Sequence, residues 1–408
     1  MTLTTAPDHS TVDRPDGVDR PAYDAVLLAG FGGPEAPDEV MPFLRTVTRG
    51  RGVPDERLEE VSHHYLALGG VSPINRHNRE LRLALETELR GRGIALPVLW
   101  GNRNSAPWLS DVVRTAAESG CRRLLGLATS AYSSYSSCRQ YREDFGNALL
   151  ADGLVGAVRI DKVRPYYDRA GFVAPFVDGT VAAVRAATAG GLATDQLQIL
   201  FTTHSIPTAM ADTSGSAELG DHGPGGAYVA QHLAVAEAVT AAVARELGTA
   251  PAWRLVYQSR SGSPTVPWLE PDICDVIGEV GQQWRSGVIV VPIGFVSDHV
   301  EVIWDLDNEA AQAAQQAGLA FWRVATPGTD ARFVSALADL VAERLDHTAA
   351  PPAVVSGPVR PDSCAPACCV NLRAPKPTTA GQDSAADWAA AGIDAAALAR
   401  SGIGSAGR

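Results

Sequence analysis

The stretch VPIGFVSDHVEVIWDLDNEA, residues 291–310, places many charged and titratable side chains directly after an apolar run. The apolar run VIVVPIG, residues 288–294, lacks the polar–apolar alternation of a half-exposed strand and is typical of a strand covered on both faces. In an open parallel sheet, ligands bind beyond the carboxyl ends of the strands. The stretch therefore predicts an α/β fold with a chemically active edge. That edge would carry Asp298, His299, Glu301, Asp305 and Glu309.

Seven other short apolar or mixed runs bring the number of predicted strands to eight. The segments 77–93 and 227–248 between them have helical composition and end in glycine. Alternating strands and helices predict parallel sheets joined by right-handed crossovers. The expected fold class is α/β, with two similar Rossmann-like halves, each a doubly wound four-stranded parallel sheet, and a cleft between them. The seven predicted strands other than the one at residues 288–294 begin at Asp24, Leu96, Arg123, Val158, Leu197, Trp253 and Leu319.

Four segments divide the chain of 408 residues. Residues 1–20 are expected to be a disordered tail, and residues 21–170 the N-terminal half. Residues 171–348 form the C-terminal half, which ends in an amphipathic helix. Residues 349–408 contain a proline-rich linker, a cysteine-rich loop and a flexible tail.

Composition narrows the possible functions. The formal net charge is −12, from 34 Lys and Arg against 46 Asp and Glu, so an acidic nucleic-acid backbone is an unfavourable partner. The N-terminal region is polar and does not resemble a secretory signal, and no apolar run reaches the length of a membrane span. We therefore expect a cytoplasmic protein without a membrane span. Its six cysteines should be reduced unless they hold a metal.

Two groups of titratable residues are candidates for catalysis. His204, in the motif THSIP, follows the fifth predicted strand, and a lone histidine there is either a structural residue or a base. Asp298, Glu301, Asp305 and Glu309 recur at spacings of three and four, which would place them on one face of a helix. That face is either a solvated acidic surface or a track for a divalent cation.

Three cysteines lie together in the motif CAPACC. Cys364, Cys368 and Cys369 are one thiol short of the usual four-thiolate site for zinc or for a two-iron, two-sulfur cluster. A disulfide between the adjacent pair would be strained. Cys121 and Cys274 have the setting of small buried apolar residues.

The motifs FGGP (31–34), GGVSPIN (69–75), THSIP (203–207) and GFVSDHVEVIWDLDNEA (294–310) resemble those of the ferrochelatases. Within that family the sequence is most similar to the coproporphyrin III ferrochelatases of actinobacteria. The resemblance extends from about residue 22 to 345. It implies two Rossmann-like halves that enclose a porphyrin. It also implies insertion of ferrous iron into coproporphyrin III, which gives coprohaem in haem biosynthesis and releases two protons.

The resemblance also implies roles for individual residues. His204 would be the base and an iron-contacting residue, with Glu301 facing it as a metal ligand or proton acceptor. A supporting shell and cation track would consist of Asp298, His299 and Asp305.

Porphyrin contacts follow from the same resemblance. Phe31 stands where related enzymes have an axial tyrosine, so it cannot ligate iron. Ser72 and Tyr141 match porphyrin-contacting positions. Tyr65 and Arg49 would help to hold propionates, and for these two an ordinary core tyrosine and a solvated arginine are equally good interpretations.

The actinobacterial members carry a two-iron, two-sulfur cluster with one cysteine in a CRQYRE context. By resemblance Cys138 joins Cys364, Cys368 and Cys369 as ligands of a [2Fe–2S] cluster.

Expected partners are coproporphyrin III, ferrous iron and the downstream coprohaem decarboxylase. Three alternatives stay open: a protoporphyrin ferrochelatase, a cobalt chelatase acting on a precobalamin tetrapyrrole, and a haem-binding redox sensor without enzymatic activity. The polar loop PEAPDEV, residues 34–40, favours the soluble tetracarboxylate.

Overall fold

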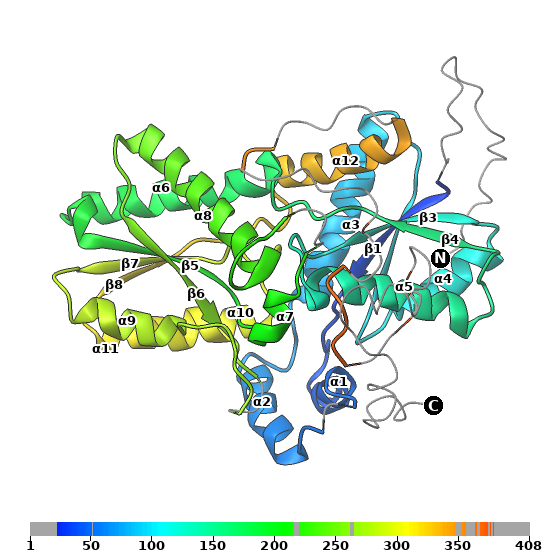
Figure 1. The fold of residues 1–408 in the computed structure, drawn as a ribbon, viewed down its shortest axis with the longest axis horizontal. Coiled ribbons are helices and arrows are strands. Elements are labelled where there is room, and N and C mark those ends of the chain that lie inside the picture. The colour runs from blue at the N-terminus through cyan, green and yellow to red at the C-terminus, as the bar shows by residue number, and fades with distance from the viewer. Residues whose placement is uncertain are drawn as a thin grey trace.

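Two four-stranded parallel sheets organise the chain in the computed structural model (Figure 1). The structure describes residues 23–50, 52–215, 220–261 and 265–346, together with 353–355, 364, 368–373, 376 and 378. The first half of the molecule is built on the sheet of strand order β2-β1-β3-β4, and the second half on the sheet of order β6-β5-β7-β8. This confirms the predicted α/β class with two similar four-stranded halves.

The strands lie close to their predicted positions. Their bounds are β1 Ala25–Gly30, β2 Val98–Asn102, β3 Arg123–Ala128, β4 Arg159–Lys162, β5 Leu197–His204, β6 Ala252–Gln258, β7 Gly287–Val291 and β8 Ala320–Arg323. Strands β1 and β7 are buried along their whole length, as expected for central strands covered by helices on both faces.

The strand order places the switch point of each sheet. In the first half the order reverses between β1 and β3, and in the second half between β5 and β7. Loops leave these neighbouring strands in opposite directions and open a space for ligands. His204 ends β5, and the segment that carries Glu301 follows β7. The fold therefore brings the two candidate catalytic residues to one switch point.

Helices cover the sheets and connect the halves (Figure 1). The final helix α12 packs on both α6 and α3 and so returns the chain to the first half. Their bounds are α1 Val40–Val47, α2 Asp55–Ala67, α3 Ile74–Gly91, α4 Leu109–Glu118, α5 Gln140–Ala151, α6 Ala170–Ala189, α7 Thr208–Asp212, α8 Gly226–Leu247, α9 Ile273–Gly281, α10 Val300–Val302, α11 Ala311–Gln316 and α12 Ala331–Asp346. Two π-helices, η2 Tyr135–Arg139 and η5 Ile303–Ala310, precede α5 and α11.

The apolar interior is shared between the two halves. One cluster contains Leu85 of α3, Phe172 of α6, Phe201 of β5 and Phe333 of α12, all fully or almost fully buried. Helices α6 and α8 are long and apolar enough to cross a membrane by length and composition. Their buried residues pack into this same cluster, which accounts for their apolar character.

The helical face predicted after β7 differs from the observed one. Helix α10 begins at Val300, so Asp298 precedes the helix and does not share its face. The chain then continues as the π-helix η5, whose wider turn replaces the α-helical spacing of three and four. The prediction of one α-helical acidic face was therefore wrong.

Parts of the predicted tails lie outside the described residues, including residues 1–20 and most of 349–408. The predicted division of the halves at residue 170 falls at the first residue of α6.

Candidate active site

His204 lies at the carboxyl end of β5 with one ring nitrogen occupied. Nδ1 contacts the carbonyl oxygen of Ser205. A carbonyl can only accept, so in the neutral ring Nδ1 carries the proton and Nε2 holds the lone pair. Nε2 lies 3.8 Å from Oε2 of Glu301. The backbone therefore fixes the tautomer in which Nε2 can accept a proton.

Glu301 is the second residue of α10 and reaches the same place from the other strand of the switch point. It is partly exposed, as is the nearby Asp305 on η5. Burial, with help from the carboxylates of Glu301 and Glu309, raises the pKa of Asp305 to about 7. The Ser259 hydroxyl and the Gln258 amide donate to Asp305 and partly oppose that shift. Asp305 can therefore exchange a proton near neutral pH.

The other two members of the expected shell behave differently. Burial lowers the pKa of His299. The nearby Glu301 carboxylate raises that pKa, and the nearby His204 lowers it. Asp298 is engaged elsewhere, since Arg323 contacts its Oδ1 at 2.6 Å and the Thr326 hydroxyl donates to the same atom at 3.1 Å. Within the described ranges no three His, Cys, Asp or Glu side chains are arranged to hold a single metal ion.

Helices α1 and α2 of the first half pack against the start of α10. Val300 belongs to an apolar cluster with Phe43 and Tyr65. Tyr65 is 6% exposed, and burial together with the Glu301 charge holds the pKa of its phenol well above its usual range. Phe31 lies edge-on to Phe43, with ring centroids 6.2 Å apart, and is 36% exposed. Phe31, Tyr65 and Glu301 therefore belong to one region.

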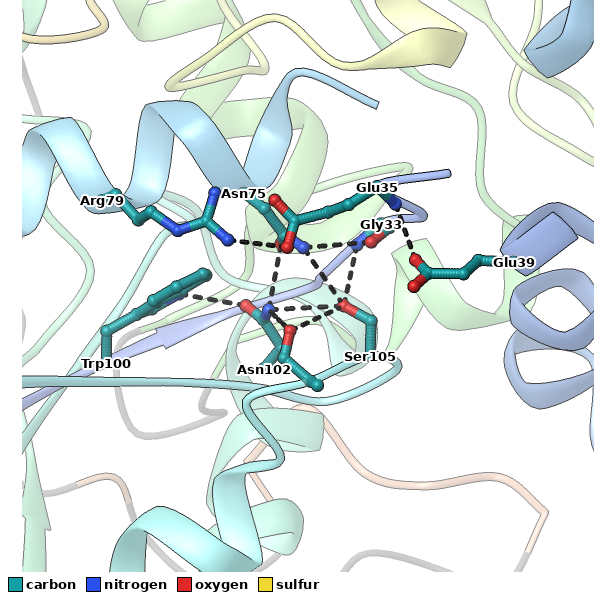
Figure 2. A network of polar contacts seen from close by, with 9 residues as sticks. Gly33, Glu35, Glu39, Asn75, Arg79, Trp100, Asn102 and Ser105 are labelled. Atoms are coloured by element: carbon teal, nitrogen blue, oxygen red, sulfur yellow. Dashed lines mark hydrogen bonds and ion pairs between the residues drawn. The ribbon is translucent and has the colours of Figure 1, made fainter. Parts of the chain in front are cut away.

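The loop after β1 is held by a buried polar network (Figure 2). Both backbone groups of Gly33 are bonded: its N–H donates to Ser105 Oγ at 3.1 Å, and its carbonyl accepts from Asn75 Nδ2 at 3.0 Å. Asn102 donates to Asn75 Oδ1 and accepts from the indole N–H of Trp100, both at 3.0 Å. These side chains fix the loop that carries Phe31.

Ser72 packs directly on this loop. Its N–H donates to the Pro34 carbonyl at 2.8 Å, and a Cβ on Gly33 would lie 2.6 Å from the Ser72 Cβ, so only glycine fits there. Tyr141 is 4% exposed, lies in the core of the first half and has the Arg103 guanidinium 4.2 Å above its ring. Arg49 is exposed on the turn after α1 and pairs with no acidic side chain in the part of the chain that is described.

The four predicted cluster cysteines come together although Cys138 is more than 200 positions from the others. Cys138 of η2 contacts Cys364, and Cys364 contacts Cys368. The sulfurs of Cys368 and Cys369 are 3.9 Å apart. Contact with Cys364 and burial hold the pKa of Cys138 well above its usual range, although Lys162 and Arg142 nearby act in the opposite direction. Cys121 and Cys274 are partly buried beside apolar clusters.

Three features of the site have no signal in the sequence motifs. Tyr228 of α8 donates its hydroxyl to the His204 carbonyl at 2.8 Å. His64 of α2 stacks on Trp304 of η5, with ring centroids 4.3 Å apart. The Asn75–Asn102 pair lies behind the Phe31 loop. Asn75 is the last residue of a quoted motif, but nothing in its spacing to Asn102 predicts their contact.

A family model and the curated relatives point to one family. The ferrochelatase family model matches residues 23–345. The coproporphyrin III ferrochelatase of Leifsonia xyli is 54% identical over 371 residues, covering 88% of this chain and 94% of the relative. That of Streptomyces griseus is 52% identical, covering 89% and 97%. Among solved structures, SirB from Bacillus subtilis with Fe³⁺ matches with a TM-score of 0.45 and 11% identity, covering 80% of this chain and 97% of SirB.

Proposed function

Because the chain belongs to the ferrochelatase family, we propose that it inserts ferrous iron into coproporphyrin III to form coprohaem. The relatives at 54% and 52% identity carry that name. The observation that carries the proposal is the facing of His204 Nε2 and Glu301 Oε2, 3.8 Å apart at one switch point. A proton acceptor and a carboxylate side by side suit a reaction that takes in a dication and releases protons.

The tautomer of the His204 imidazole determines which nitrogen can accept a proton. The macrocycle must lose two pyrrole N–H protons as Fe²⁺ enters, so charge balances without another reactant. His204 accepts a proton at Nε2, because Nδ1 already donates to the Ser205 carbonyl. Glu301 lies next to Nε2 and either binds the incoming iron or takes the proton onward. Asp305, with its pKa raised to about 7, can receive a proton from this pair and exchange it near neutral pH.

Porphyrin binding is assigned to the region between Phe31 and Glu301. Phe31 offers an exposed aromatic ring and Ser72 a hydroxyl beside the glycine loop. Arg49 is exposed and free to approach a propionate, and Tyr65 and Tyr141 complete the proposed contacts. In this assignment Asp298 and His299 act indirectly, by anchoring the segment before α10.

The proposal includes a [2Fe–2S] cluster at Cys138, Cys364, Cys368 and Cys369, because these residues supply the thiol donors that such a cluster takes. Four thiols are the usual ligand set, and here they lie in consecutive contact. Arg142 supports the fit, because its Nη1 is buried with no hydrogen-bond partner among the described residues and the guanidinium lies near Cys138. A buried guanidinium with one unbonded nitrogen beside thiols suits an anionic group. When bound, such a cluster can carry one electron and fix the fold around it.

The same proposal includes a cytoplasmic location and delivery of the product to a coprohaem decarboxylase. It is supported by the soluble tetracarboxylate substrate and by the burial of α6 and α8 in the core.

Anaerobic metal insertion tests the function directly. The purified protein is mixed with Fe²⁺ and with coproporphyrin III or protoporphyrin IX, and the absorbance change is followed. We expect faster turnover of coproporphyrin III. Faster turnover of protoporphyrin IX would make that porphyrin the substrate. Preference for Co²⁺ would favour a cobalt chelatase, and tetrapyrrole binding without insertion would favour a haem-binding sensor.

A further inference from the structure

Among the described residues, Cys369 of the C-terminal cysteine loop, meaning Cys364 and residues 368–373, is hydrogen-bonded to the second half. Sγ of Cys369 accepts a hydrogen bond from the Gly215 N–H at 3.1 Å, and the Cys369 N–H donates to the Gly215 carbonyl at 3.4 Å. Cys369 has a φ of 54°, which is unfavourable for a residue with a Cβ. The two bonds to Gly215 therefore hold Cys369 in a conformation that it would otherwise leave.

Gly215 is joined through Ser214 to the first turn of α8. Ser214 Oγ accepts from the Tyr228 N–H at 2.8 Å, and the Ser214 carbonyl accepts from the Ala227 N–H at 3.1 Å. The approach of Gly215 to this turn is close, since a Cβ on Gly215 would lie 2.7 Å from the Ala227 Cβ. Movement of Gly215 must therefore displace the start of α8.

Tyr228 connects that turn to the catalytic strand. Its side chain is 4% exposed, and its hydroxyl donates to the His204 carbonyl at 2.8 Å. The Thr203 hydroxyl lies 2.8 Å from the Tyr228 hydroxyl oxygen and donates to it, because the single tyrosine hydroxyl proton is already donated to the His204 carbonyl. Tyr228 thus holds the last two residues of β5, where the direction of the His204 ring is set.

The other side of the cysteine loop is anchored in the first half. Asn371 donates to the Tyr135 hydroxyl and to Glu143 Oε2, both at 3.1 Å. Cys138 of η2 contacts Cys364 in the same region. The loop therefore bridges the two halves, and its contact with the second half leads to His204.

We propose that Tyr228 is a positioning residue for His204, and that the C-terminal cysteine loop holds Tyr228 in place through Gly215 and Ser214. The proposal rests on the proposed function, in which His204 is the proton acceptor. Loosening any of these contacts should change the orientation of the His204 imidazole. It should leave the porphyrin-binding surface near Phe31 intact.

Kinetics of two conservative variants test the first link. Tyr228→Phe keeps the ring and removes the bond to His204, so we expect kcat to fall about fivefold to tenfold with KM for coproporphyrin III unchanged. Ser214→Ala should likewise lower kcat and leave KM unchanged. In the double variant, kcat should fall by less than the product of the two single-variant factors. Tyr257→Phe is the matched control, since Tyr257 is a buried tyrosine on β6 beside Thr203. An equal loss in Tyr257→Phe, or a change in KM alone, would overturn the proposal.

Hydrogen exchange tests the second link without requiring turnover. In Cys369→Ala, amide exchange should accelerate at residues 203–206 and 213–215 and in the first turn of α8, whereas Cys274→Ala should match the wild type. Acceleration confined to residues 138–143 and 368–373 would contradict the coupling. If Cys369→Ala does not fold, the same exchange pattern is expected in Ser214→Ala, and its absence there contradicts the proposal. A wild-type protein without insertion activity would refute the proposed function, while the exchange pattern would still test the coupling.

Discussion

His64 of α2 stacks on Trp304 of η5 with an interplanar angle of 10°, and this contact joins the two halves beside Glu301. The Trp304 indole N–H also donates to Glu309 at 2.8 Å. Burial lowers the pKa of His64, partly opposed by the Glu309 carboxylate, so the neutral ring is the form that stacks. The stacked pair therefore attaches the π-helix η5 to helix α2 of the first half.

Replacing His64 tests this connection and its pH dependence. His64→Ala should lower the free energy of unfolding by about 1 kcal/mol, the usual value of an aromatic pair. Because the folded pKa is depressed, the contribution is present above the unfolded pKa of about 6.5 and is lost as pH falls through the folded pKa. His64→Phe keeps a stacked ring and should lose this pH dependence. Urea titrations at pH 5 and pH 8 measure both effects, and a stability difference between His64→Ala and wild type that grows at pH 5 would refute the account.

Glu301→Gln removes a charge while keeping the shape of the side chain. We expect kcat to fall about a hundredfold, the typical effect of losing a positioned acid or base. Asp298→Asn serves as a comparison, because Asp298 is bonded to Arg323 and Thr326 and should affect stability more than chemistry. Single-turnover insertion measures the chemical step. An unchanged rate in Glu301→Gln would show that this carboxylate is structural.

Phe31 has no atom that can ligate iron, so product bound to the protein should lack the absorption band of a phenolate-to-iron transition. The variant Phe31→Tyr should introduce that band, since residue 31 sits on the loop held by Gly33 and Asn75. Absorption spectra of the two product complexes provide the measurement. A phenolate band in the wild type would mean that another tyrosine, such as Tyr141, reaches the iron.

The proposed cluster at Cys138, Cys364, Cys368 and Cys369 predicts a coloured protein. Purified under anaerobic conditions, it should contain about two irons and two acid-labile sulfides per chain. Changing Cys138, Cys364, Cys368 or Cys369 to Ser should bleach the colour and increase protease cleavage after residue 348, whereas Cys121→Ser and Cys274→Ser should not. Zinc in place of iron, or a fully coloured Cys138→Ser protein, would contradict the assignment.

Much of this architecture follows from the sequence because parallel α/β sheets leave strong local signals. Buried strands such as β7 read as continuous apolar runs, and helix ends such as that of α8 are marked by glycine. The switch-point rule then places His204 and Glu301 close together. The π-helix η5 could not be predicted, because its residues also satisfy α-helical spacing. That ambiguity also produced the wrong expectation that Asp298 shares a helical face with Glu301.

Long-range polar contacts are the part of the site that local patterns miss. Tyr228 lies 24 positions from His204 and reads as one apolar residue of an amphipathic helix. Asn75 and Asn102 meet only because α3 and β2 pack against the same loop. Such contacts depend on tertiary packing, so a single sequence without aligned homologues contains no signal for them.

Iron insertion by His204→Ala, measured beside porphyrin binding, tests whether His204 is the proton acceptor of the reaction. Wild type and variant are each titrated with coproporphyrin III by fluorescence, and then mixed with Fe²⁺ under anaerobic conditions while absorbance is followed. We predict similar porphyrin affinity in both proteins and a loss of insertion in the variant, because the proton acceptor at Nε2 is gone. Insertion by His204→Ala at close to the wild-type rate would contradict it.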